Sequence, residues 1–153
     1  RVERIAFLDT SSRPDDETKR IRRQDLIDLA KRGNFKGVSP QLMPLFIHPD
    51  RAEDTVLTGI ITAMAMDIGS EGFVRQQIAI SSRVDSAPTL AKIKCPALVI
   101  VGEHDILTPP ELAEEIAAGI KGAKLEYIAG AAHLPTLEEP EATNEVMKAW
   151  LRS

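Results

Sequence analysis

The sequence predicts an α/β fold in which parallel strands are flanked by helices and a largely helical segment follows the first strand. Two observations support this prediction. Residues 89–153 alternate apolar runs of strand length with helical stretches, and such a βαβα order implies parallel strands joined by right-handed crossovers. Residues 13–88 show helical periodicity and no convincing strand. The organisation expected is therefore a core strand over 1–12, a helical segment over 13–88 and a second core portion over 89–153.

The first strand is predicted from residues 2–10, VERIAFLDT. Their central run IAFL is continuously apolar, which is typical of a strand buried on both faces of a parallel sheet. The stretch SSRPDD ends this strand. Pro14 and the acidic residues after it favour a helix N-terminus, because carboxylates are stabilised by the positive end of the helix dipole.

The segment after this strand is predicted to be helical throughout. Apolar side chains recur every four residues at Val56, Ile60 and Met64, and Leu57 and Ile61 beside them complete one apolar stripe. Glycines are expected to end the helices on either side, at positions 33 and 69. The stretch DSAP, 85–88, is predicted to be a loop. The predicted helical stretches are 15–32, 40–47, 51–67 and 71–82.

The last part of the chain contains two further predicted strands, each followed by a helix. PALVIVG is a buried strand that ends at Gly102, and AKLEYIAG is the next strand. Between them, TPPE places a hydroxyl at Thr108 for the N-cap, a proline at the first helical position and a glutamate two positions later. The predicted helices are 109–119 and 138–152, and the second of them has Val146, Trp150 and Leu151 as core contacts.

Composition and charge exclude several classes of protein. The formal net charge of −4 argues against nucleic acid as a main partner, since phosphate binding needs a concentrated positive surface. No run of 18 or more apolar residues occurs, so neither a transmembrane helix nor a membrane partner is expected. No signal peptide is visible. The one cysteine, Cys95, rules out an intrachain disulfide and fits a reducing compartment, so we expect a cytoplasmic protein.

Two local features qualify this outline. The basic cluster KRIRR, residues 19–23, is interpreted as a solvated helix face, with an anion-binding patch as the alternative. The chain opens on Arg1 rather than methionine and runs almost at once into IAFLDT. This abrupt start suggests a segment of a longer protein.

A carboxylate and an imidazole follow the two strands of the last part of the chain. Asp105 lies in VGEHD after the first of them, and His133 lies in AGAAH after the second. Functional groups gather at the carboxyl ends of parallel strands, and one crossover helix joins these two strands, so we expect the two side chains to be neighbours. An aspartate that orients a histidine is half of a nucleophilic triad. A histidine after a strand is also commonly structural, so the pair alone leaves both interpretations open.

The loops that carry this pair contain two extended patterns. They are G-x-x-D-x-x-[ST]-P at Gly102, Asp105, Thr108 and Pro109, and G-x-x-H-x-x-x-x-E-x-P at Gly130, His133, Glu138 and Pro140. Together they closely resemble the C-terminal end of α/β-hydrolase-fold enzymes, and most of all the esterase and lactonase-like branch. RVERIAFLDTSSRPD resembles the family's strand after the nucleophile helix, and residues 13–88 then take the place of its helical cap.

The resemblance implies that Asp105 and His133 are the acid and the base of the family's triad. It also implies a nucleophile in a G-x-S-x-G elbow before residue 1, together with the oxyanion-hole amides. Ser70, in DIGSEG, is the nearest imitation within the chain, but Ile68 occupies the place of the first glycine and the site lies between two helices. We therefore expect the nucleophile to lie outside these 153 residues and the isolated chain to be inactive.

The remaining candidate groups are assigned to structure. His104 belongs to the triplet EHD, whose consecutive side chains cannot all point into one site, so a site-rim histidine is favoured over a metal ligand. His48 precedes a proline and is interpreted as structural or solvent-facing, and Cys95 as an inert packed thiol. No cofactor and no metal are expected. Met43, Met64 and Met66 are interpreted as packing between helices, with an acyl pocket as the alternative.

Three functional hypotheses follow. The first is the C-terminal half of a serine hydrolase that cleaves a small carboxylic ester or lactone in the intact protein. The second keeps the fold and the pair Asp105 and His133 but changes the chemistry to that of a dehalogenase, a C–C hydrolase or a haloperoxidase. The third is a non-catalytic fragment or binding module. Because the strand 2–10 would pair with a missing N-terminal half, its apolar edge predicts self-association of the isolated chain.

Overall fold

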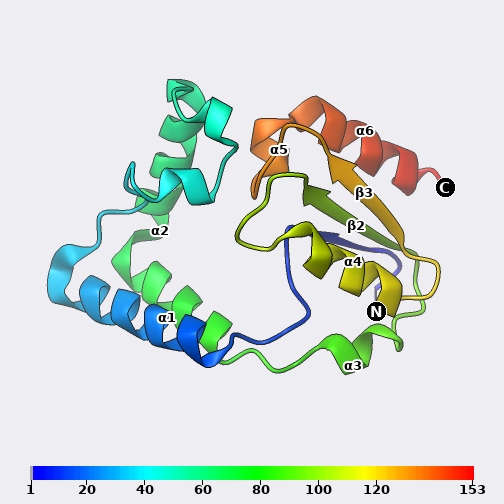
Figure 1. Cartoon of the computed structure of the whole chain (residues 1–153), viewed down its shortest axis with the longest axis horizontal. Helices are drawn as coiled ribbons and strands as arrows, with labels where there is room; N and C mark the ends of the chain where they lie inside the picture. Colours follow the sequence, from blue (N-terminus) through cyan, green and yellow to red (C-terminus); the bar gives the residue numbers. More distant parts are fainter. Residues whose placement is uncertain (1) are drawn as a thin grey trace.

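The computed structural model describes residues 2–153, and within them it contains a three-stranded parallel sheet (Figure 1). The strands are β1 (Ile5–Leu8), β2 (Ala97–Gly102) and β3 (Lys124–Ile128), in the order β1-β2-β3. Parallel pairing of all three confirms the predicted α/β class. The expected core segment 1–12 begins one residue before the described part of the chain.

The register of the sheet brings the carboxyl ends of the strands to one edge. Leu8 pairs with Ile100, and Gly102 pairs with Ile128. The residues that follow each strand therefore emerge next to one another, which is the condition for a shared site at this edge.

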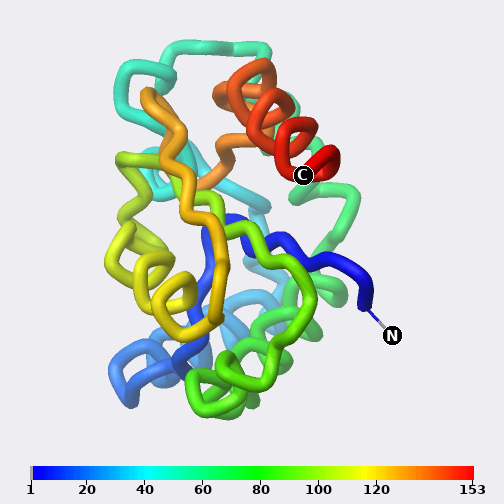
Figure 2. Tube along the Cα trace, turned by 90° about the vertical axis from the view of Figure 1, so that its right-hand side faces the viewer, coloured from blue at the N-terminus to red at the C-terminus, as the bar shows by residue number. Residues whose placement is uncertain are grey.

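Helices cover both faces of the sheet, and β2 is therefore buried on both sides. Val99 and Val101 pack under α4 (Pro110–Gly119), while Leu98 and Ile100 pack under α6 (Pro140–Leu151). The alternation follows from the period of two in a strand, in which successive side chains point to opposite faces. Figure 2 shows the strands running between these two helices.

The predicted helix 138–152 is present in the structure but begins two residues later, at Pro140. A single turn, α5 (Pro135–Glu138), precedes α6, and Glu139 between them has φ −132° and ψ 64°. The break has a local cause, because the ring of Pro140 disfavours helical geometry in the residue before it.

Residues between β1 and β2 are mainly helical, as predicted. The break expected at position 69 is present, because Gly69 has φ 65° and ψ 176° inside the long helix and kinks it. Gly33, with φ 80°, lies in the turn of π-helix that follows the first helix. No helix among the described residues is long and apolar enough to span a membrane. The elements are α1 (Glu17–Leu29), the π-turn (Ala30–Asn34), short 3₁₀ turns (Met43–Leu45 and Pro49–Arg51), α2 (Thr55–Ser81) and α3 (Ala87–Leu90).

The apolar stripe predicted on α2 is divided between the interior and the surface. Leu57 and Ile61 are buried, in a cluster with Met43 and Ile47. The row at positions 56, 60 and 64 is exposed instead, and the side chain at position 56 is 72% exposed. One row packs against Met43 and Ile47 and the other faces solvent, so apolar spacing alone could not identify the buried row.

The basic cluster 19–23 is also only partly solvated. Arg23 forms an ion pair with the buried Asp15 and donates a hydrogen bond of 2.8 Å to Gln77 on α2. This side chain therefore links α1 to α2, whereas Lys19, Arg20 and Arg22 are exposed as predicted.

The carboxyl end of β2 leaves no room for a side chain at Gly102. A Cβ atom placed there would lie 1.9 Å from the carbonyl oxygen of Ala132 and 2.7 Å from that of Ala131. The loop that carries His133 thus passes directly over the end of β2, and the absence of a side chain at Gly102 sets how closely the two can approach.

We predict that Gly102→Ala lowers the free energy of unfolding by about 3 kcal/mol or more, because the added methyl overlaps backbone atoms that cannot turn aside. Gly59→Ala is the matched control. Gly59 lies near the N-terminal end of α2 and its Cβ would meet nothing within 4 Å, so helix propensity should stabilise the protein by about 0.5 to 1 kcal/mol. Chemical denaturation measures both. Equal effects of the two substitutions would contradict this account of the β2 end.

Candidate active site

Asp105 and His133 lie together at the carboxyl edge of the sheet. The Nδ1 atom of His133 is 2.9 Å from Oδ2 of Asp105. The aspartate side chain is fully buried, whereas 22% of the histidine side chain is exposed. The structure therefore pairs a shielded carboxylate with an imidazole that remains accessible from outside, and the catalytic roles of both stay predictions.

The loop after β2 holds the carboxylate of Asp105 in place. Oδ1 accepts hydrogen bonds from the backbone N–H groups of Leu107 and Thr108, at 2.8 and 3.0 Å. Oδ2 accepts a hydrogen bond of 2.6 Å from the hydroxyl of Thr108. The prediction that this hydroxyl caps α4 is wrong: Pro109 occupies the cap position, and no side chain caps the helix. Thr108 orients the aspartate instead.

These contacts shift the pKa values of the two groups in opposite directions. Burial raises the pKa of Asp105, but the hydrogen bonds from His133 and Thr108 outweigh it, and the pKa is lowered overall. Burial lowers the pKa of His133, but the hydrogen bond and the charge of Asp105 outweigh it, and the pKa is raised overall. Both shifts favour an ionised aspartate and a more basic imidazole.

The backbone of His133 is attached to the helical part of the chain. Its N–H donates a hydrogen bond of 3.2 Å to the carbonyl oxygen of Phe46. The ring of Phe46 also lies 6.3 Å from the imidazole, measured between ring centroids. The segment before α2 therefore borders the site directly.

Similarity to known proteins agrees with this geometry. No protein-family model matches the chain. The AB hydrolase superfamily protein YisY from Bacillus subtilis is 29% identical over 135 residues, which are 88% of this chain and 44% of that protein. A thermophilic esterase from Thermogutta terrifontis is 27% identical, with a TM-score of 0.91 over 99% of this chain and 56% of that chain. The chain belongs to the α/β-hydrolase superfamily.

A second solved structure is similar over the same extent. The enol-lactonase from Burkholderia xenovorans LB400 is 26% identical, with a TM-score of 0.88, and the match covers the whole of this chain and 57% of that chain. The chain thus spans less than half the length of its curated α/β-hydrolase relatives and little more than half of these solved structures.

Sequence reasoning missed Asp9, which follows β1 at the same edge of the sheet. Polar atoms of Asp9, Asp105 and His133 all lie within 4.8 Å of one another. The Asp9 backbone has φ 43°, a left-handed conformation that is uncommon outside glycine, and Oδ1 accepts a hydrogen bond of 2.9 Å from the N–H of Gly102. The sequence does contain a signal for Asp9. Asp105 was identified as a carboxylate that follows a buried strand, and Asp9 follows the predicted strand IAFL in the same way.

The charge state of Asp9 depends on this crowding. Burial raises its pKa most, and the hydrogen bond from Gly102 opposes the rise, while the charge of Asp105 adds to it and that of His133 subtracts from it. The balance raises the pKa of Asp9 from 3.8 to about 7. Two carboxylates so close to one imidazole do not ionise independently, because their charges repel.

The same three groups were considered as a metal site. Carboxylate and imidazole are common metal ligands, and among residues 2–153 no other group of three lies together in this way. Both oxygens of Asp105 already accept hydrogen bonds from N–H or O–H groups, which leaves no lone pair aimed at a cation. The contacts fit a hydrogen-bonded pair better than a metal centre.

The other candidate residues lie outside the pair. His104 is exposed at the rim, and its ring contacts the ring of His48 edge to face, with centroids 4.3 Å apart. Ser70 donates a hydrogen bond to the carbonyl oxygen of Ala30, at the start of the π-turn that follows α1. Cys95 is half-buried before β2. Of the three methionines, Met43 is buried, whereas Met64 and Met66 are exposed, so only the first packs as predicted.

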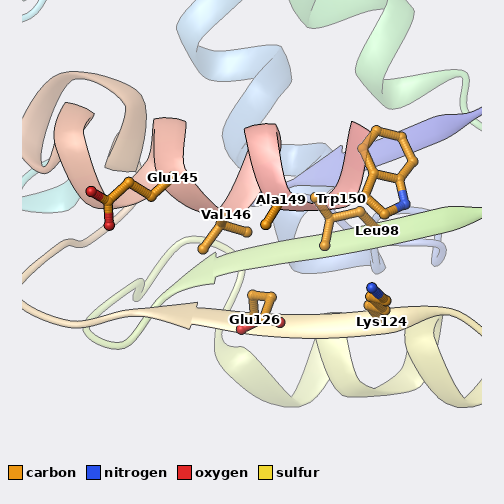
Figure 3. Close-up of a pocket in the computed structure, with 7 residues that line it drawn as sticks. All are labelled: Leu98, Lys124, Glu126, Glu145, Val146, Ala149 and Trp150. Atoms are coloured by element: carbon orange, nitrogen blue, oxygen red, sulfur yellow. The ribbon is translucent and has the colours of Figure 1, made fainter. Parts of the chain in front are cut away.

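One surface hollow, of about 350 Å³, adjoins Asp105 and is lined by Ile47, Pro49 and His104 among others. A second hollow, of about 270 Å³, lies between α6 and the strands β2 and β3 (Figure 3). Leu98 and Trp150 line the second hollow with charged residues around them, and it holds none of the candidate site residues.

We predict that stability depends on pH through Asp9. A carboxyl group whose pKa is raised on folding binds protons more tightly in the folded chain, so stability falls as pH rises from 3.8 to about 7. Asp9→Asn removes this loss and keeps an oxygen for the N–H of Gly102. The free energy of unfolding of the variant, relative to that of the wild type, should therefore be higher at pH 8 than at pH 4. The expected increase is about 1 to 2 kcal/mol, because partial solvation reduces the effect of the pKa shift.

Chemical denaturation at the two pH values measures this difference. Asp25→Asn, at an exposed position on α1, is the matched control and should shift stability equally at both. An Asp9→Asn variant that behaves like the control would show that Asp9 is ionised normally.

Proposed function

We propose that this chain supplies the acid and the general base of an α/β-hydrolase that cleaves a small carboxylic ester or lactone through a Ser-Asp-His triad. The observation that carries the proposal is the contact of 2.9 Å between Nδ1 of His133 and Oδ2 of Asp105. Within residues 2–153, Nε2 of the same ring has no hydrogen-bond partner. The imidazole is thus oriented on one side and available to a nucleophile on the other.

The reaction follows from this arrangement. Nε2 of His133 accepts the hydroxyl proton of a serine as the serine oxygen attacks the ester carbonyl, and Asp105 stabilises the imidazolium that forms. The imidazolium then donates that proton to the departing alcohol, which leaves an acyl-serine. Water then attacks the acyl group as His133 takes a proton from it, and the imidazolium gives this proton to the departing serine oxygen, which releases the carboxylic acid and restores the free serine.

The nucleophile in this proposal lies outside the chain. Among residues 2–153, no serine hydroxyl bonds to His133, and the nearest sequence imitation of an elbow, Ser70, is engaged with Ala30. In this proposal the nucleophile elbow and the oxyanion-hole amides precede the first strand described here, which is what the resemblance to α/β-hydrolases implies. Asp105 and His133 follow in the family's order of nucleophile, acid and histidine.

Residues 13–88 act in this proposal as a cap over the site. Support comes from an apolar cluster that joins the two parts of the chain. Met43, Ile47, Leu57 and Ile61 form its buried centre, and Leu134, next to His133, packs against it. A cap attached at this point would exclude water from the reacting atoms and shape an apolar substrate pocket.

We expect His133→Ala in the full protein to lower kcat/KM for short p-nitrophenyl esters by about 10⁴-fold or more, because the general base is lost. Asp105→Asn should cause a loss of the same order by disturbing the tautomer of the imidazole. His104→Ala, a neighbouring histidine exposed at the rim, is the control and should keep near wild-type turnover.

Two results of this assay would contradict the proposal. Wild-type ester turnover by the His133→Ala protein would exclude His133 as the base. Halide release from haloalkanes, with no ester hydrolysis by the wild type, would point to the dehalogenase chemistry of the same fold.

The 153-residue chain alone is predicted to show no esterase activity, because the nucleophile and the oxyanion hole would be missing. The measurement is p-nitrophenyl ester hydrolysis by the purified chain, with the His133→Ala version of the same chain as the background. Turnover above that background would show that the chain contains its own nucleophile. Self-association through the edge of β1 also stays a prediction.

A further inference from the structure

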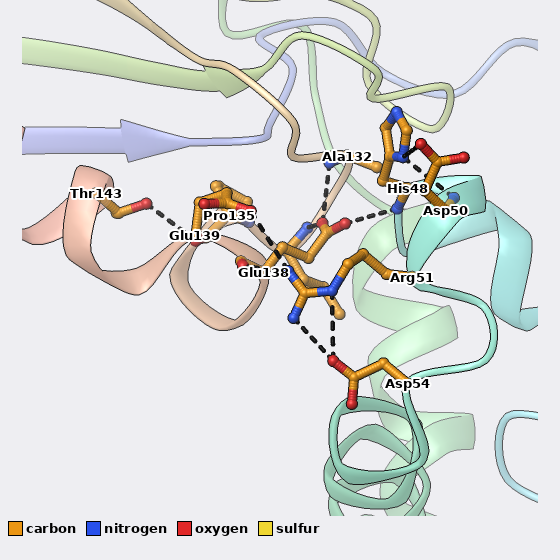
Figure 4. A network of polar contacts seen from close by, with 10 residues as sticks. His48, Asp50, Arg51, Asp54, Ala132, Pro135, Glu138, Glu139 and Thr143 are labelled. Atoms are coloured by element: carbon orange, nitrogen blue, oxygen red, sulfur yellow. Dashed lines mark hydrogen bonds and ion pairs between the residues drawn. The ribbon is translucent and has the colours of Figure 1, made fainter.

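Glu138 is almost completely buried, and within residues 2–153 all hydrogen bonds of its side chain come from backbone N–H groups. The residue is 2% exposed. Oε1 accepts hydrogen bonds from the N–H groups of Ala132 and Leu134, at 2.9 and 3.1 Å. Oε2 accepts one of 2.6 Å from the N–H of His48 (Figure 4). A buried charge is costly unless its hydrogen bonds are satisfied, and these three donors satisfy it.

The first two donors flank His133 on either side. Oε1 of Glu138 thus binds the N–H of Ala132, before the histidine, and the N–H of Leu134, after it. The N–H of His133 itself is held by the carbonyl of Phe46. Three consecutive amides therefore have fixed partners, which restricts the backbone from which the imidazole extends toward Asp105.

The third donor belongs to the helical part of the chain, and Arg51 strengthens the same junction. Its guanidinium donates to the carbonyl oxygen of Glu138 at 2.7 Å and to Asp54 at 2.9 Å (Figure 4). Asp54 in turn caps α2 by accepting from the N–H groups of Val56 and Leu57. A continuous set of hydrogen bonds thus runs from the first turn of α2 to the loop that carries His133.

We propose that Glu138 is a positioning residue that couples the segment 46–51 to the backbone on both sides of His133, so that the helical segment and the imidazole keep one geometry. The catalytic meaning of this coupling rests on the proposed function, but the coupling itself does not. The contact acts through the protein backbone, and Glu138 touches no reacting atom.

Glu138→Gln separates the two sides of this contact. The amide oxygen can still accept from the N–H groups of Ala132 and Leu134, whereas the NH₂ group then faces the N–H of His48, and two donors cannot bond. Hydrogen exchange at the amide of His48 should therefore accelerate by about tenfold or more. If the two sides are coupled, exchange at the amide of His133 should accelerate with it, although its own partner is unchanged.

A proton NMR spectrum of the same protein reports on the hydrogen bond of the His133 imidazole. The Nδ1 proton shared with Asp105 should give a separate downfield signal in the wild type, and this signal should broaden or disappear in Glu138→Gln. Glu145→Gln, an exposed isosteric change on α6, is the matched control and should alter neither measurement. Exchange at the amides of β2 reports any loss of global stability, so the coupling requires that the amides of His48 and His133 accelerate by more than those of β2 in Glu138→Gln.

The outcomes are distinct. Faster exchange confined to His48, with an unchanged signal from His133, would overturn the coupling. A wild type without the Nδ1 signal would count against the Asp–His pair, and hence against the proposed function, while the exchange data still decide the coupling.

If Glu138→Gln does not fold, native-state exchange of the wild type in denaturant replaces it. The amides of His48, Ala132 and Leu134 should then share one opening free energy, and separate values would refute the coupling.

Discussion

The structure depends on the parallel pairing of β2 with both of its neighbours. Every residue of β2 is buried, and the strand supplies side chains to the packing under α4 and to the packing under α6. Because its partners run in the same direction, the residues after all three strands emerge at one edge. Asp9, Asp105 and His133 meet there for that reason, although most of the chain lies between the first of them and the other two.

Crowding at this edge gives the site its electrostatic character. Asp105 keeps a low pKa because donors surround it, whereas Asp9 has a pKa near 7 because burial and a second carboxylate oppose its ionisation. The pKa of the His133 imidazole is raised, chiefly by the hydrogen bond and the charge of Asp105. Raised basicity suits a group that must accept a proton from a nucleophile, as the proposed function requires. The same geometry would serve the other chemistries of the superfamily.

The helical segment and the sheet meet through polar groups as well as apolar ones. The cluster around Ile47 fills the junction, and hydrogen bonds to Glu138 fix its register. Apolar packing tolerates small displacements, whereas a buried carboxylate with three N–H partners does not, because any lost partner leaves a polar group unsatisfied. The buried glutamate therefore specifies one arrangement of the junction rather than simply adding stability.

The sequence by itself determined the class of fold, the three strands, the break at Gly69 and the adjacency of Asp105 and His133. Each of these follows from local periodicity, from a residue with special backbone freedom, or from the rule that parallel strands end at one edge. Only the tertiary structure decided which row of α2 is buried, that Thr108 orients Asp105 rather than capping a helix, and that Glu138 binds the N–H of His48. Those outcomes depend on how the elements pack against one another, because hydrophobic spacing identifies neither the partner of an apolar row nor the partner of a polar side chain.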